Sequence, residues 1–235
     1  MKLSLSVRVA EKFSDKRQAS LDLDGLARLA ADNGYAALCL RASQVGVHSP
    51  AAVATQAADT LKKHKLVASM LTGDFAIPEN SDVEGPQALR RITPYLDLAQ
   101  TLGTDLLRIC MKTQEDIKWA RHAADEAAER GLCLAHQSHT RSLFEKVDET
   151  LEVLQAVDRP NFGLIYEPAN LELCGEDYGA DAIRRLAPHT FNVYLQNQRI
   201  DPAGADSLDT WCRGPVRFDH VPIWETDGIA FAPLL

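Results

Sequence analysis

Glu167 is the residue whose type and position most directly suggest chemistry. It follows the apolar run 162–166, and Pro168 turns the chain immediately after it. A carboxylate at the end of a buried strand can bind a divalent cation or remove a proton from carbon. The structural alternative is a carboxylate that caps the next segment or pairs with Arg41 or Arg108. The position at a strand end favours a catalytic or metal-binding role.

Two imidazoles and an amide stand together in the run 136–139, His-Gln-Ser-His. A histidine at a strand end can shuttle protons near neutral pH or ligate a metal. Alternate residues of a strand face opposite sides, so Gln137 and His139 are expected near a pocket while His136 points away. In the alternative, one histidine packs against the neighbouring helix and the other is solvated.

Three cationic side chains could hold an anionic group of a substrate. Arg41, Arg108 and Lys112 each follow or end an apolar run, and arginine binds phosphate or carboxylate through a planar fork. The alternative for these cations is an internal ion pair with Glu167 or Asp74.

Hydroxyl and amide groups near the last apolar run suit the hydroxyls of a sugar. The residues concerned are Asn192, Tyr194, Gln196 and Asn197. Alternatively, they satisfy their own backbone at a polar strand end. The segment after Ile200, with Trp211, Arg213 and several prolines, is expected to be a long irregular loop, which is often a lid. Its aromatic and basic content would suit a sugar, or else a contact with another subunit.

The elements that must position these residues follow from apolar periodicity. Strands are expected at residues 3–9, 36–40, 66–71, 105–111, 132–137, 162–167 and 190–196, and helices at 21–33, 50–63, 86–102, 115–130, 143–156 and 179–186. This βα alternation has no internal linker, and it predicts an α/β protein with either an open doubly wound sheet or a closed (β/α)8 barrel. Neither G-x-G-x-x-G nor a P-loop occurs, so no motif supports nucleotide binding.

Polar residues at the strand ends favour the barrel. Strand after strand ends in them: Arg41, Thr72 with Asp74, Arg108 with Lys112, Gln137 with His139, Glu167 with Asn170, and Gln196 with Asn197. In a barrel the carboxyl ends of all strands converge on one face, and that face is the active site. Residues 1–235 are therefore predicted to form a single TIM-barrel domain.

Composition bounds the class of protein. The 235 residues carry 25 Lys and Arg against 33 Asp and Glu, a net charge of −8. That balance disfavours a nucleic-acid backbone binder, and no run approaches the roughly 20 apolar residues that span a bilayer. The five cysteines lack metal-type spacing, and the N-terminus does not read as a signal peptide. We expect buried free thiols and a cytoplasmic protein with no membrane partner.

Three stretches of the sequence resemble the xylose-isomerase-like TIM barrels, which include sugar isomerases, epimerases and endonuclease IV. The stretches are Gln137-Ser138-His139 with Leu143-Phe144-Glu145, the run 160–171, and the run 192–197. They look like the Glu-x-His, Asp-x-x-His and His-x-His-x-Lys-Asp motifs of that family. The resemblance implies a divalent metal (Mn, Mg, Co or Zn) held by Glu, Asp, His and a Glu on the last strand.

The match departs from the family at the metal ligands. Gln137 stands where the first Glu is expected, Glu167 replaces the Asp, and Tyr194 stands where a metal histidine would be. Asn170 and Asn192 replace other histidines. Residues 228–235 look like the start of the helix before the last strand, so we expect a C-terminally incomplete barrel.

The leading hypothesis that the resemblance implies is a sugar isomerase or epimerase that moves a proton next to a carbonyl. Glu167 would be metal ligand or base, Gln137 a neutral metal ligand or orienting group, and His139 a proton shuttle. The substrate would be a sugar or sugar acid, contacted by Arg41, Arg108, Lys112, Asn170, Asn192, Tyr194 and Gln196, and the protein a homo-oligomer. The alternatives are a dehydratase or C-glycoside deglycosidase-like lyase, and a sugar-binding barrel without catalysis.

Overall fold

A computed structural model describes residues 2–12, 15–73 and 86–232 of the chain. The chain divides into two compact units. The first comprises Met1–Cys110 and Trp119–Leu134, and the second comprises Met111–Lys118 and Ala135–Leu235. That the chain forms a single domain stays a prediction.

The first unit is built on four parallel strands. They are β1 (Ser4–Ser6), β4 (Ala37–Leu40), β5 (Val67–Thr72) and β6 (Leu106–Ile109), and each pairs with the next. A 3-10 helix η1 (Val7–Ala10) and the antiparallel pair β2 (Glu11–Lys12) and β3 (Asp15–Ala19) follow β1. The strand expected at residues 3–9 is therefore shorter than predicted.

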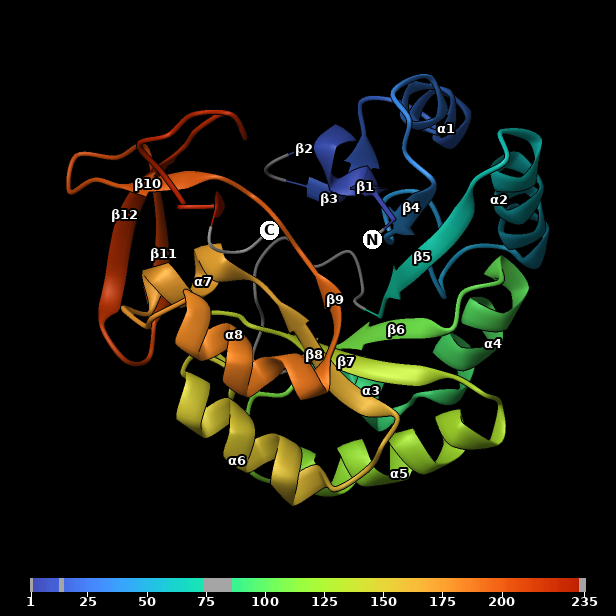
Figure 1. Ribbon diagram of the computed structural model, residues 1–235. Coiled ribbons are helices and arrows are strands. Elements are labelled where there is room, and N and C mark those ends of the chain that lie inside the picture. The colour runs from blue at the N-terminus through green and yellow to red at the C-terminus, as the bar shows by residue number, and fades with distance from the viewer. Residues whose placement is uncertain (1, 13–14, 74–85, 233–235) are drawn as a thin grey trace. The chain divides into compact units, whose positions relative to one another are not determined.

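Helices follow the strands of this unit at the expected places. They are α1 (Leu23–Asp32), α2 (Ala51–Lys63), the short α3 (Gln87–Arg90), α4 (Thr93–Leu102) and α5 (Asp116–Glu129), whose first turn belongs to the second unit. In Figure 1, α2 lies between α1 and α4 and contacts both. Asp22 caps α1 by accepting from Gly25 N at 2.8 Å, and Gly103, at φ 71°, ends α4.

The second unit contains the remaining parallel strands. Strand β7 (Cys133–Gln137) begins in the first unit and ends in the second, where β8 (Phe162–Tyr166) and β9 (Thr190–Val193) follow. The hydrogen-bonded order is β1-β4-β5-β6-β7-β8-β9. All five residues of β8 are buried, as expected for a strand covered on both faces. The helices of this unit are α6 (Val147–Val157), α7 (Pro168–Leu173) and α8 (Ala180–Leu186), with η2 (Ala187–His189) after α8.

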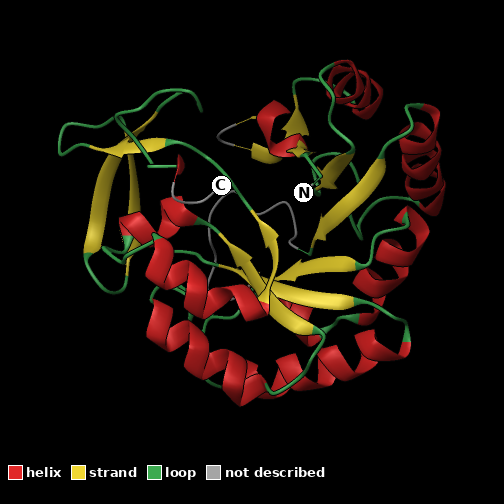
Figure 2. Cartoon of the chain, viewed as in Figure 1, coloured by secondary structure: helices red, strands yellow, loops and turns green. Residues whose placement is uncertain are grey.

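The prediction of a long irregular loop after Ile200 is wrong. This segment forms a three-stranded antiparallel sheet, in the order β10 (Gln198–Ile200), β12 (Gly214–His220) and β11 (Asp206–Thr210), drawn in yellow in Figure 2. Val216 and Phe218 alternate with more exposed neighbours on β12 and pack with Leu173 of α7. This small apolar cluster packs the antiparallel sheet against α7.

The chain's last described residues also differ from expectation. Residues 228–231 form neither helix nor strand, and Ile229 N donates to Asn197 Oδ1 at 2.8 Å. Residues 233–235, which the expected helix included, lie outside the described residues. No described helix is long and apolar enough to cross a membrane.

Candidate functional site

Glu167 is the centre of a buried polar cluster in the second unit. Its residue is 1% exposed, and its Oε2 accepts hydrogen bonds from the side-chain amides of Gln137 and Asn170. The Asn170 contact is 2.6 Å, and the same Nδ2 also donates to the backbone oxygen of Ser138 at 2.8 Å. The structure thus joins three of the residues that the sequence predicted for the site.

Local structure places these side chains. Glu167 ends β8 in an extended conformation and occupies the N-cap position of α7, with Pro168 in the first turn. Asn170 lies three residues further on, which puts its amide on the same side as Glu167. The Glu167 side chain makes no capping hydrogen bond, so the capping alternative does not describe it.

Hydrogen bonds orient the buried carboxylate of Glu167. A buried polar group is costly unless hydrogen bonds stabilise it, and two amide N–H groups are directed at one carboxylate oxygen. One donor stands at the end of β7 and the other in α7. The arrangement therefore presents an oriented carboxylate, the type of group that acts as a general base.

The two histidines of the run 136–139 have different environments. His136 is buried and stacks on Phe144, with ring centroids 4.0 Å apart and planes at 8°. The structural alternative expected one histidine to pack against the neighbouring helix; His136 packs instead on Phe144, which lies in the turn before α6. His139 is half-buried, and its Nδ1 donates to the carbonyl of Thr140 at 2.8 Å. That bond places the proton of the neutral ring on Nδ1, so Nε2 carries the lone pair that a proton shuttle needs.

Arg41 forms the internal ion pair of the structural alternative, but with another partner. Its Nε lies 2.8 Å from Glu11 Oε1, and Ser43 Oγ donates to the same oxygen at 2.9 Å. Both charged side chains are almost fully buried, at 6% and 2% exposed. Asp74, one of the partners considered from sequence, lies outside the described residues. Glu11 was missed because nothing in its sequence context marks it as buried.

Arg108 belongs to the same unit as Arg41, and both guanidinium groups act on the Cys39 thiol. Burial is the larger effect and raises the pKa of Cys39, while the charges of Arg41 and Arg108 oppose it. Lys112, in the second unit, is buried and donates from Nζ to the backbone oxygen of Arg141 at 2.5 Å. The substrate-binding roles of these cations stay predictions.

Burial alternates over residues 192–196, although β9 ends at Val193 and not at the predicted residue 196. Asn192, Tyr194 and Gln196 are half-buried, while the intervening Val193 and Leu195 are exposed. Asn192 Oδ1 accepts from Val193 N at 2.8 Å, a backbone contact of the kind that the structural alternative proposed.

Asn197 is structural. Its Nδ2 donates to the backbone oxygens of Pro222 and Glu225, each at 2.9 Å, and these bonds fasten the segment after β12. It therefore stands apart from the residues that remain candidates for substrate binding.

A second cluster in this unit had no signal in the sequence. Glu145, Cys174 and Cys212 each offer one ligand atom, and these atoms lie within 4.8 Å of one another. The three residues come from segments far apart in the chain, so their spacing resembles no metal motif. Only the packing of the small antiparallel sheet could have indicated it.

The family comparison decides the identity of the fold. A family model described as the xylose isomerase-like TIM barrel matches residues 27–234. The chain belongs to this family. No curated protein matches the sequence. The parallel sheet of seven strands with its helices agrees with a barrel of this family whose eighth unit is partial or missing among the described residues.

Several solved structures resemble the chain at low sequence identity. A probable 3-DHS dehydratase, AsbF, from Bacillus anthracis is 20% identical with a TM-score of 0.66, covering 86% of this chain and 75% of that one. A D-psicose 3-epimerase is 12% identical with a TM-score of 0.65, covering 88% and 77%. The IOLI protein, solved with a zinc atom, is 15% identical with a TM-score of 0.64, covering 89% and 77%. These likenesses show a shared fold.

Gln137 and Asn170 both turn an N–H toward the carboxylate of Glu167, and an amide nitrogen is not a metal ligand. Tyr194 stands where an imidazole was expected, and a phenol is a poor ligand for Mn²⁺ or Mg²⁺. The metal roles of Gln137 and Glu167 stay predictions.

Proposed function

We propose that this protein is an enzyme that removes a proton from the carbon next to a carbonyl of a sugar or sugar acid, leading to isomerisation or epimerisation. The observation that carries the proposal is the buried carboxylate of Glu167, held by the amides of Gln137 and Asn170. Membership of a family whose similar structures include an epimerase and a dehydratase supports an enzyme.

In this mechanism Glu167 is the general base. Gln137 and Asn170 fix the orientation of its carboxylate, so no reorganisation is needed when the proton is transferred. His139, whose Nδ1 is held by Thr140, offers Nε2 to receive and return a proton at a neighbouring oxygen or carbon. The ammonium of Lys112 supplies positive charge in the same unit for an anionic group of the substrate.

Elimination is the second candidate activity, because it begins with the same proton abstraction. The similarity to a structure titled as a probable dehydratase favours considering it. The two activities differ in what leaves the intermediate: epimerisation returns a proton, whereas elimination expels a hydroxyl group and gives an unsaturated product.

Proton exchange in D₂O tests the proposal whichever product forms. The protein is incubated with D-fructose, D-psicose and a set of keto sugar acids, and loss of the C–H signal next to the carbonyl is followed by NMR. We expect exchange with at least one substrate and a roughly 100-fold or greater loss in Glu167→Gln, as for removal of a general base. The product spectrum then separates an isomer from an unsaturated acid.

The matched control removes a carboxylate that has no part in the proposed mechanism. Glu149→Gln removes an exposed carboxylate paired with Lys146 at 3.1 Å and should leave exchange unchanged. Equal exchange rates in Glu167→Gln and the unmodified protein would refute the role of Glu167. Sugar binding without any exchange would identify a non-catalytic sugar-binding barrel instead. Homo-oligomer formation and a cytoplasmic location stay predictions.

A further inference from the structure

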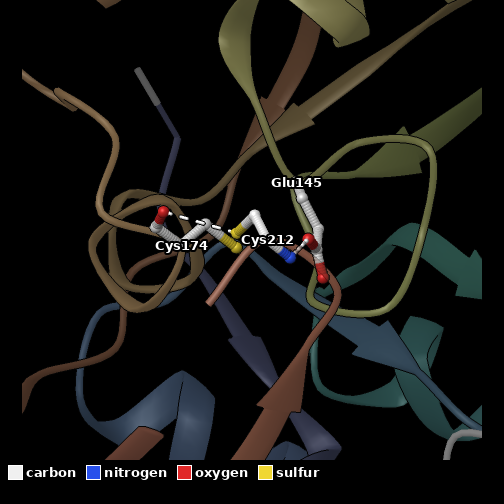
Figure 3. A group of neighbouring side chains, drawn as sticks. All are labelled: Glu145, Cys174 and Cys212. Atoms are coloured by element: carbon white, nitrogen blue, oxygen red, sulfur yellow. Dashed lines mark hydrogen bonds between the residues drawn. The ribbon is translucent and has the colours of Figure 1, made fainter. Parts of the chain in front are cut away.

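Three side chains of types that ligate metals come together in the second unit, and Glu167 is not one of them. Figure 3 shows the side chains of Glu145, Cys174 and Cys212 pointing toward one another, with the two sulfur atoms adjacent. Their ligand atoms all lie within 4.8 Å of one another. Cys174 is the C-cap residue of α7, Cys212 lies in the turn between β11 and β12, and Glu145 precedes α6.

We propose that Glu145, Cys174 and Cys212 form a binding site for a thiophilic divalent cation of the Zn²⁺ type. Two thiolates and one carboxylate are ligands that Zn²⁺ accepts in tetrahedral sites, and water completes the fourth position. Ligand atoms around a tetrahedral Zn²⁺ lie about 3.8 Å apart, given Zn–S bonds of about 2.3 Å. The present spacing therefore needs a contraction of at most about 1 Å, which side-chain rotation can supply.

The surroundings of Glu145 support a bound cation. Its side chain is buried, at 2% exposed, and accepts three backbone N–H groups. Oε1 accepts from Arg141 at 2.5 Å and Trp211 at 2.8 Å, and Oε2 accepts from Cys212 at 2.9 Å. Such bonds fix the direction of the carboxylate, as outer contacts do in metal sites.

The two thiols lie close enough to the carboxylate to share one cation. The charge of a divalent cation would stabilise both thiolates and offset the charge of the carboxylate. Cys212 Sγ already contacts the carbonyl of Cys174 at 3.5 Å, which keeps the two residues together.

Cobalt substitution of the full-length protein tests the proposal. Co²⁺ is added under reducing, oxygen-free conditions to protein freed of metal by a chelator. We expect about one Co²⁺ per chain with the near-ultraviolet charge-transfer band of a Co²⁺–thiolate bond. Cys174→Ser and Cys212→Ser should each weaken this band strongly, and the double variant should abolish it. Cys133→Ser, which removes a thiol outside the cluster, should retain it, and so should Glu167→Gln.

A second measurement needs no variant. Zn²⁺ should slow alkylation of Cys174 and Cys212, read by peptide mass spectrometry, by at least tenfold while leaving the rate at Cys133 unchanged. The absence of a charge-transfer band in the unmodified protein would overturn the proposal. So would a band that survives in the double variant, or equal alkylation with and without Zn²⁺. Glu167→Gln leaves the metal site intact. A failure of the metal-site proposal can therefore be distinguished from a failure of the proposed catalytic activity.

Discussion

Removal of the Glu145 carboxylate should destabilise the fold by an amount that its contacts allow one to work out. In Glu145→Ala, the backbone N–H groups of Arg141, Trp211 and Cys212 lose their acceptor. A buried donor left without a partner costs about 1–3 kcal/mol, and these three are only part-buried, so about 1 kcal/mol each is appropriate. The expected loss is about 3 kcal/mol, equivalent to a fall in Tm of about 6–12 °C for a chain of this size.

Glu145→Gln provides a graded comparison. The amide oxygen can still accept from Arg141 and Trp211, which share Oε1, but its NH₂ group then faces the N–H of Cys212. One hydrogen bond is lost in place of three, so we expect a loss of about 1–2 kcal/mol. Glu149→Ala removes only an exposed pair with Lys146 and should cost less than about 0.5 kcal/mol.

Urea unfolding followed by circular dichroism, in the presence of a chelator, measures these differences without any contribution from bound metal. The order of stability should be unmodified protein and Glu149→Ala, then Glu145→Gln, then Glu145→Ala. An alanine variant within about 0.5 kcal/mol of the unmodified protein would refute the reasoning, because the three N–H groups would then have other partners. A glutamine variant as unstable as the alanine variant would show that the charge, and not the number of acceptors, decides the cost.

Two further predictions concern the first unit. Glu11→Gln removes the negative charge that faces the buried Arg41, and we expect a loss of about 3 kcal/mol in urea unfolding; no change would show that the pair contributes nothing. Hydrogen bonds from Lys63 and then His64 lower the pKa of Asp24 to about 2, from 3.8, so its stabilising effect is present above pH 4 and is lost as the pH falls toward 2. The stability difference between the unmodified protein and Asp24→Asn should therefore shrink between pH 5 and pH 2, and a constant difference would contradict this origin.

The parallel sheet and the central carboxylate could be predicted because both depend on local pattern. The apolar run before Glu167 is long enough for one buried strand, and all five residues of β8 are buried. β7 and β8 are consecutive in the chain and neighbours in the sheet, so residues at their carboxyl ends meet. Gln137 and Glu167 therefore lie close together because they end two consecutive strands, and apolar periodicity predicts both strands.

The antiparallel sheet was not predicted because its segment contains prolines and short polar runs, which are typical of loops. Strand β12 does carry the period-2 signal, since Val216 and Phe218 are buried while Pro215 and Arg217 are exposed. The signal is only two apolar residues long, and it stabilises a strand because Leu173 lies against it. An apolar pattern this short predicts a strand only when its packing partner, here Leu173, is known from the fold.

The convergence of Glu145, Cys174 and Cys212 lies beyond what spacing can show. Local metal motifs place ligands a few residues apart on one turn or hairpin, whereas the backbone N–H of Cys212 meets Glu145 across 67 residues. Three elements must form first: the segment before α6, the end of α7 and the β11–β12 turn. α7 begins after Glu167 and ends at Cys174, so this six-residue helix connects the carboxylate of the proposed base to a thiol of the proposed metal site. The residues proposed for catalysis could be predicted from the ends of single strands. The residues proposed for metal binding come together only through tertiary packing.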